Sequence, residues 1–161
     1  MIVYLAHPID FAGDNREKML ELADHVRNLL IDSGCSVYSP ALAWRASTPM
    51  SPIIQKINLD ALVNSDAALF IMPEKVPSLG VPFELGLAHA HSIPSVILRG
   101  NDTATDLRES SALLAYLERV AIYGFDDVLS ACLHTASLAQ YRWHHSDTTE
   151  ARGDTNERTG E

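Results

Sequence analysis

Short β-rich runs alternate with helical patterns along most of this chain, and this alternation limits its fold more than any other feature. The runs with strand character are Ile2 to Ala6, Ser36 to Ser39, Ala67 to Met72, Ser95 to Leu98 and Val120 to Gly124. Two consecutive strands joined through a helix lie parallel in one sheet, because the helix carries the chain back to the starting edge. The sequence therefore predicts an α/β protein with a five-stranded parallel sheet.

Capping residues and apolar spacing mark the helices between these runs. Asp14 is followed by Glu17 three residues later, which is a capping pattern, and Gly34 is a stop signal after a stretch with helical periodicity. Four further helices are predicted, at Ser51-Pro52 to about Asn64, from about Val81-Pro82, over about Glu109 to Arg119, and over about Asp126 to Trp143.

Right-handed crossovers between five such strands favour a doubly wound sheet. Numbered along the chain, the expected strand order is 2-1-3-4-5, with helices on both faces in a three-layer arrangement of the flavodoxin or Rossmann type. Winding reverses between the first and third strands, so a ligand is expected beyond their carboxyl ends. Residues 1–143 are predicted to form this single domain. Residues 144–161 hold five acidic and two basic residues and are predicted to be a disordered acidic tail.

Composition excludes several classes of partner. Twelve Lys and Arg residues against 21 Asp and Glu residues give a net charge of -9, which disfavours a nucleic-acid polymer but still permits a small anion. The two cysteines, Cys35 and Cys132, have no metal-ligand spacing, so both are expected to be buried reduced thiols and no zinc site is expected. A basic leader is absent, as is an apolar stretch long enough to span a bilayer, which favours a soluble, cytoplasmic protein without a membrane partner.

The segment around Glu84 has the strongest chemical character. Ser78 and Gly80 lie directly before a predicted helix, where a hydroxyl, backbone N–H groups and the helix dipole can bind a phosphate. A simple turn containing serine is the alternative. The dipole favours anions by roughly 0.3–1 kcal/mol, so Glu84 is expected to be a carboxylate suited to attack on an anomeric carbon. A glutamate that only caps its helix is equally consistent with this spacing.

Helical periodicity separates two polar candidates in the second helix. Asn58 shares a face with the apolar residues and is predicted to face inward, where its amide can donate and accept hydrogen bonds. Asp60 falls on the opposite face, four residues after Lys56. An inward asparagine can also be a satisfied core polar group. His7, at the end of the first strand, can donate a proton near neutral pH, although a lone loop histidine is more often simply exposed.

Three motifs together resemble the nucleoside 2-deoxyribosyltransferase family over about residues 1 to 125. They are Tyr4-Leu5-Ala6-His7-Pro8-Ile9, the run Leu62-Val63-Asn64-Ser65-Asp66-Ala67, and the run from Pro77 to Ala88. In the third, the form Ser-x-Gly-x-x-x-Glu-x-Gly is similar to the branch of 2'-deoxynucleoside 5'-phosphate N-hydrolases and related CMP-type hydrolases. The transferase branch typically has aspartate where this chain has Ser78.

The resemblance implies a role for each matching residue. Glu84 would be the nucleophile that forms a covalent glycosyl-enzyme intermediate, and Tyr4 would orient it. Ser78 and Gly80 would hold the 5'-phosphate. The family also implies a homodimer in which a serine of the neighbouring subunit completes the phosphate site, and Ser111 is the best match, with Ser110 a near rival.

Three departures from the family pattern stand out. His7 replaces a glycine. Asp10 replaces an arginine near the phosphate, so that Arg16, Arg45 or Arg99 would have to supply the charge. Asn58 replaces an aspartate and cannot deliver a proton to the departing base.

The resemblance therefore implies an N-glycosidase that hydrolyses a (deoxy)nucleoside 5'-monophosphate, a small-molecule substrate, without metal or cofactor. Asn58 would position the substrate, and His7 is hypothesised to protonate the leaving base in place of the missing acid. Two alternatives remain: a nucleoside 2-deoxyribosyltransferase that moves deoxyribose between bases, and a nucleotide-binding module without turnover.

Overall fold

A single parallel sheet forms the centre of the protein in the computed structural model, which describes residues 1–8, 14–43, 51–73, 80–100 and 120–150. Its strands are β1 (Ile2–Ala6), β2 (Ser36–Tyr38), β3 (Ala67–Met72), β4 (Ser95–Arg99) and β5 (Val120–Gly124). All of them pair in parallel, in the order β2-β1-β3-β4-β5. The predicted architecture and strand order are confirmed.

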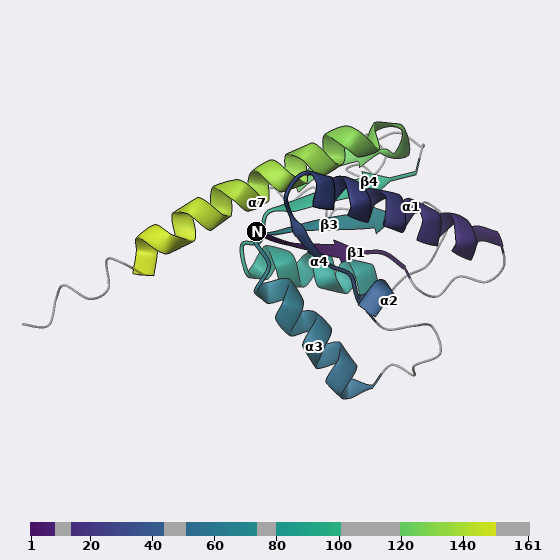
Figure 1. Ribbon diagram of the computed structural model, residues 1–161. Helices are drawn as coiled ribbons and strands as arrows, with labels where there is room; N and C mark the ends of the chain where they lie inside the picture. The colour runs from purple at the N-terminus through teal and green to yellow at the C-terminus, as the bar shows by residue number, and fades with distance from the viewer. Residues whose placement is uncertain (9–13, 44–50, 74–79, 101–119, 151–161) are drawn as a thin grey trace, which may run out of the picture.

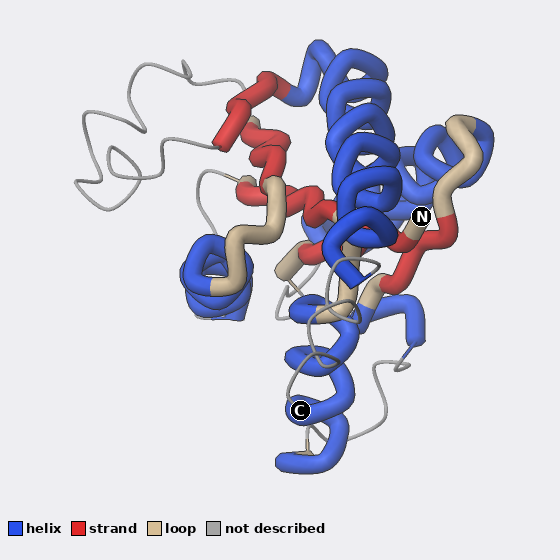
Figure 2. Tube along the Cα trace, turned by 90° about the vertical axis from the view of Figure 1, so that its left-hand side faces the viewer, coloured by secondary structure: helices blue, strands red, loops and turns tan. Residues whose placement is uncertain are grey.

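Helices cover both faces of this sheet (Figure 1). The described elements are α1 (Asp14–Asp32), α2 (Pro40–Ala43), α3 (Pro52–Val63), α4 (Gly80–Ala90), the 3₁₀ turn η1 (Phe125–Asp127) and α7 (Val128–Glu150). Helices α1 and α7 lie on one face, and α3 and α4 lie on the other (Figure 1). Turned by 90°, the strands form one layer between the helices (Figure 2).

Alternation along the buried strands divides the core in two. Val3, Leu5 and Leu69 point toward α1 and α7, whereas Tyr4 and Phe70 point toward α3 and α4. All five side chains are fully buried. β1 and β3 are central strands and therefore contribute to both halves of the core. Tyr4 belongs to the half of the core that α3 and α4 cover.

The predicted helix signals act as expected at two places. The Ser51 hydroxyl oxygen accepts a hydrogen bond from the backbone N–H of Ile54 at 3.3 Å and caps α3. Gly34 follows α1 with a φ of 84°, a left-handed conformation that glycine adopts without strain. The helix predicted over Glu109 to Arg119 lies outside the described residues.

The last helix ends later than predicted. Its pattern suggested an end at Trp143, but α7 continues through residues 144–150, so these residues are helical and not part of a disordered tail. The physical reason is the absence of a stop signal: neither proline nor glycine occurs between Val128 and Gly153. Residues 151–161 lie outside the described part of the chain. No described helix is long and apolar enough to cross a membrane.

Candidate active site

Tyr4 and Glu84 meet on the sheet face that α3 and α4 cover. Tyr4 lies in β1 and Glu84 in the N-terminal half of α4, and the Tyr4 hydroxyl donates a hydrogen bond of 2.7 Å to Oε1 of Glu84. Helix α4 begins just beyond the carboxyl end of β3, so Glu84 is brought to the edge where strands β1 and β3 end. One carboxylate oxygen is thus held in place by a buried phenol.

Burial and the hydrogen bond from Tyr4 shift the pKa of the Glu84 carboxyl group in opposite directions. Burial raises its pKa from 4.5 to about 6, and the hydrogen bond from Tyr4 lowers it. The expectation that the helix end alone sets the charge of Glu84 is therefore incomplete. A carboxyl group with a pKa of about 6 is still mostly ionised at pH 7. Burial and the neighbouring Glu84 raise the pKa of Tyr4, so Tyr4 remains a protonated donor.

A second pair lies beside the first. Asn58 of α3 is buried, as predicted, and its Oδ1 accepts a hydrogen bond of 2.8 Å from the Tyr38 hydroxyl. The ring of Tyr38 stacks on that of Tyr4, with centroids 5.8 Å apart and an interplanar angle of 27°. Contacts therefore run from Asn58 through two tyrosine rings to Glu84.

Asp60 lies on the other side of α3, also as predicted. Its Oδ2 is 2.6 Å from Nζ of Lys56, and the two side chains are 55% and 75% exposed. Such an exposed pair contributes little to stability. Asp60 is therefore a surface residue, and Asn58 is the polar residue that α3 directs toward the sheet.

Sequence reasoning missed Tyr38. The available signal was strand register: β2 pairs with β1, and Tyr38 lies directly opposite Tyr4. In a parallel pair, side chains at paired positions point to the same face. Two tyrosines at equivalent positions of neighbouring strands therefore mark one polar patch, provided that the register is known.

His7 is buried and not exposed, with 6% of its surface accessible. Nδ1 lies 3.1 Å from the backbone oxygen of Pro8, which can only accept, so Nδ1 carries the proton. Burial lowers the pKa of His7, which keeps the ring neutral. Nε2 then has a lone pair and no proton. In this resting tautomer Nε2 can accept a hydrogen bond, and the hypothesised proton donation by His7 stays a prediction.

Three buried polar atoms lack a hydrogen-bond partner among the described residues, and all lie at strand ends. They are Nε2 of His7 after β1, the hydroxyl oxygen of Ser39 after β2, and Nη1 of Arg99 at the end of β4. Buried polar groups are normally satisfied, so groups left open on one edge indicate where water or a ligand binds. The edge is the one predicted from the winding of the sheet.

The predicted phosphate-binding residues are only partly described. Gly80 is the first residue of α4 and is exposed, so its position is the helix end that the sequence predicted. Ser78, Ser110, Ser111, Asp10 and Arg45 lie outside the described residues. Arg16 is exposed on α1, on the face away from Glu84. Arg99 is the described arginine with a buried guanidinium nitrogen at the carboxyl edge of the sheet.

Metal-binding clusters of three or more His, Cys, Asp or Glu side chains are absent from the described part of the chain. Cys35 and Cys132 are buried free thiols, as predicted. Burial raises the pKa of both thiols, that of Cys132 to about 11, which makes them poor nucleophiles.

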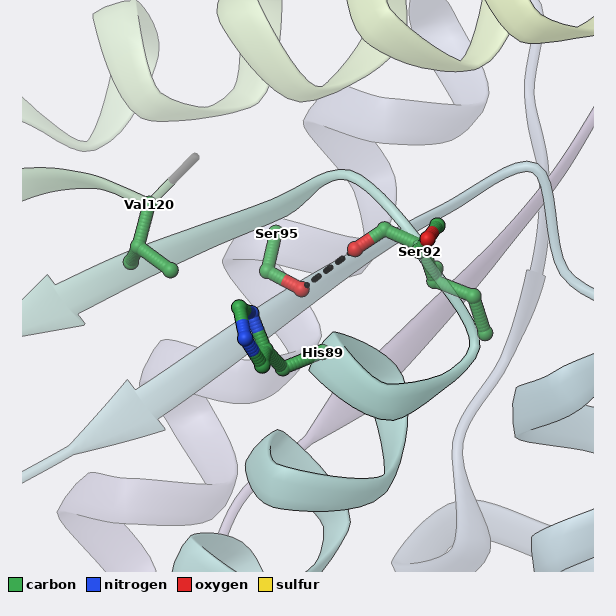
Figure 3. A pocket seen from close by; sticks show the side chains of 5 residues that line it. His89, Ser92, Ser95 and Val120 are labelled. Atoms are coloured by element: carbon green, nitrogen blue, oxygen red, sulfur yellow. Dashed lines mark hydrogen bonds between the residues drawn. The ribbon is translucent and has the colours of Figure 1, made fainter. Parts of the chain in front are cut away.

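A small cavity of about 190 Å³ lies at the opposite edge of the sheet, where β4 and β5 begin. His89, Ser92, Ile93, Ser95 and Val120 line it (Figure 3). The Ser95 hydroxyl donates to the backbone oxygen of Ile93 at 3.0 Å and is therefore satisfied. None of the predicted site residues borders this cavity, and the chemistry of the site lies elsewhere.

The effect of burial on Glu84 predicts that Glu84→Gln stabilises the protein in a pH-dependent way. A carboxyl pKa raised on folding makes the folded state most favourable when the group is protonated, and this advantage is lost as pH rises through about 6. The neutral glutamine avoids that loss. We expect it to raise the free energy of unfolding by about 2 kcal/mol at pH 8 and by much less at pH 4.

Thermal unfolding at both pH values measures this difference. Glu21→Gln, at an exposed carboxylate of α1, is the matched control and should shift Tm equally at pH 4 and pH 8. Equal shifts for Glu84→Gln as well would show that Glu84 is not desolvated.

Known structures share this fold at low sequence identity. A 2-deoxyribosyltransferase from Bacillus psychrosaccharolyticus matches with a TM-score of 0.54 at 18% identity, covering 80% of this chain and 96% of the other. A CMP N-glycosidase from Clostridium botulinum matches with a TM-score of 0.59 at 18% identity, covering 86% and 98%. A 2-desoxiribosyltransferase from Leishmania mexicana matches with a TM-score of 0.51 at 21% identity, covering 89% and 98%.

At the level of sequence, no functionally curated protein matches the chain significantly. The profile of one protein family, however, matches almost the whole domain, from residue 3 to residue 147. This match spans the three motifs whose resemblance was noted above, and it includes Tyr4, Asn58 and Glu84. The chain belongs to the nucleoside 2-deoxyribosyltransferase family.

Proposed function

We propose that this protein is a retaining N-glycosidase that hydrolyses the N-glycosidic bond of a (deoxy)nucleoside 5'-monophosphate. The observation that carries the proposal is the 2.7 Å hydrogen bond from the Tyr4 hydroxyl to Oε1 of Glu84, at the edge where the strands end. A largely ionised carboxylate with one oxygen fixed by a neutral donor has its second oxygen available for attack.

In the first step, Oε2 of Glu84 attacks C1' of the sugar, and the C1'–N bond breaks with its electron pair going to the base. Tyr4 keeps the carboxylate oriented through Oε1 during this step. In the second step, water attacks C1' of the glycosyl ester, the C1'–Oε2 bond breaks with its electron pair going to the Glu84 carboxylate, and the water loses a proton to solvent, which releases the sugar phosphate. Asn58 cannot supply a proton, and the neutral His7 carries none at Nε2, so in this scheme the departing base takes its proton from solvent.

The 5'-phosphate would bind at the N-terminus of α4, where Gly80 and Ser78 precede Glu84. We propose Arg99 as the arginine that balances the phosphate charge, because its buried Nη1 has no partner among the described residues. Met72 of β3 lies directly opposite Arg99 in the sheet, and α4 follows β3 in the chain. Ser111 from a second subunit of a homodimer would complete this site.

The nucleophile assignment predicts that Glu84→Gln abolishes base release from every substrate, lowering the rate by at least about 1000-fold. Ribo- and deoxynucleoside 5'-monophosphates are incubated with each protein, and free base is measured by chromatography. Glu21→Gln serves as the control for an exposed carboxylate and should be fully active. Equal activity of wild type and Glu84→Gln would refute the assignment.

The same assay separates the alternatives. With a second free base present, a hydrolase still yields sugar phosphate, whereas a transferase yields a new nucleoside or nucleotide. Thermal stabilisation by monophosphates without any base release would instead indicate a binding module.

The phosphate assignment predicts a change in KM that depends on the substrate. Arg99→Gln should raise KM for a nucleoside 5'-monophosphate by about tenfold or more, because a charge-assisted hydrogen bond is lost. It should leave kinetics with the corresponding nucleoside unchanged. Arg16→Gln, at the exposed arginine of α1, is the control and should change neither. A similar loss on both substrates would show that Arg99 has a structural role.

With its proton on Nδ1, the neutral ring of His7 leads to a prediction of how activity depends on pH. We propose that Nε2 of His7 accepts a hydrogen bond from a substrate hydroxyl. In wild type, kcat/KM should fall below pH 6 as Glu84, whose pKa is raised to about 6, becomes protonated. His7→Ala should lower kcat/KM by about tenfold and leave this acidic limb in place. An alkaline limb that is present in wild type and lost in His7→Ala would instead support proton donation by His7.

A further inference from the structure

Tyr38 makes two contacts of different kinds, and each involves a different part of the candidate site. Its hydroxyl donates a 2.8 Å hydrogen bond to Oδ1 of Asn58, on α3. Its ring stacks on Tyr4, whose hydroxyl holds Glu84 on α4. No motif in the sequence pointed to Tyr38, and the proposed mechanism assigns it no role.

We infer that Tyr38 is a positioning residue that fixes Asn58 and the nucleophile Glu84 relative to each other, through its hydroxyl and its ring respectively. This inference rests on the proposed function and adds a determinant of geometry to it. Tyr38 itself does not touch the reacting atoms in this scheme.

The hydroxyl of Tyr38 acts on the amide of Asn58. Asn58 is buried, and an amide inside a protein can be rotated by half a turn with little change in shape. In the orientation that the structure shows, Oδ1 accepts from the Tyr38 hydroxyl, whereas the rotated amide would turn Nδ2 toward the phenol oxygen and donate to it. Tyr38 therefore holds the Oδ1 end of the buried Asn58 amide in place.

The ring of Tyr38 acts on the ring of Tyr4. Tyr4 is fully buried, and its ring stacks on that of Tyr38, which packs against the same core cluster on the α3 and α4 face. Stacked aromatic rings restrict one another by contact area and electrostatics. The restriction matters here because a small rotation of Tyr4 would move its hydroxyl away from the Glu84 carboxylate.

Two substitutions separate the two functions of Tyr38. Tyr38→Phe removes the hydroxyl and keeps the ring, so base release should slow by about tenfold while the acidic limb of the pH profile stays in place. Tyr38→Leu also removes the stacking. We expect it to raise the pKa of Glu84 and move the acidic limb to higher pH, because the hydrogen bond from Tyr4 lowers that pKa.

A control tyrosine exists on the other face of the sheet. Tyr123, in β5, has a hydroxyl that lies 2.8 Å from Nδ1 of His134, so Tyr123→Phe loses a comparable hydrogen bond far from Glu84. It should leave base release and its pH profile unchanged. Asn58→Ala combined with Tyr38→Phe should be no slower than Asn58→Ala alone, since the hydroxyl acts through Asn58. Full additivity of the two changes would contradict that part of the inference.

One measurement tests the ring without requiring turnover. The change in Tm caused by Glu84→Gln is followed against pH, once with Tyr38 present and once in the Tyr38→Leu background. A transition displaced to higher pH in that background supports the inference, and coincident transitions overturn it. Because this readout is thermal unfolding, failure of the proposed activity and failure of the positioning role give different results.

Discussion

The hydrogen bond between Tyr4 and Glu84 is the contact on which the rest of the site depends. The two residues are 80 positions apart in the chain, and only the fold brings them together. Tyr4 is fixed by the central strand β1, and Glu84 by a helix that begins where β3 ends. An ionised carboxylate in such a buried place needs a donor, since water no longer solvates it fully. The tyrosine supplies that donor without introducing a second charge.

The two faces of the sheet carry different kinds of side chain. Toward α1 and α7 the strands present aliphatic residues such as Val3, Leu5 and Leu69. Toward α3 and α4 the same strands present Tyr4 and Tyr38, whose hydroxyl groups find their partners on the helices. A polar cluster of this kind inside a core is acceptable because its buried hydroxyl groups are paired.

Much of the fold could be predicted from the sequence, because local signals determine it. Strands alternate with helices along the chain, and right-handed crossovers between them favour one strand order. Helical periodicity places Asn58 on the buried face of its helix and Asp60 on the exposed face. The end of α7 is later than predicted, because no helix breaker occurs between Val128 and Gly153. The burial of His7 and its contact with the Pro8 carbonyl could not be predicted, because neither is visible in the sequence. Tyr38 was missed for a related reason, namely that the alignment of β2 with β1 is a property of the assembled sheet.

The geometry of the candidate site therefore depends on the register of β2 against β1. Tyr38 is the last residue of a strand only three residues long, and it reaches Tyr4 because the two occupy paired positions. A shift of β2 by one residue would turn Tyr38 to the opposite face, yet β2 is an edge strand and the remaining four strands would be unaffected. Secondary structure content would hardly change in such a molecule, while the polar cluster would be dismantled. A measurement of specific activity is therefore more sensitive to the register of the edge strand β2 than spectroscopic measures of folding are.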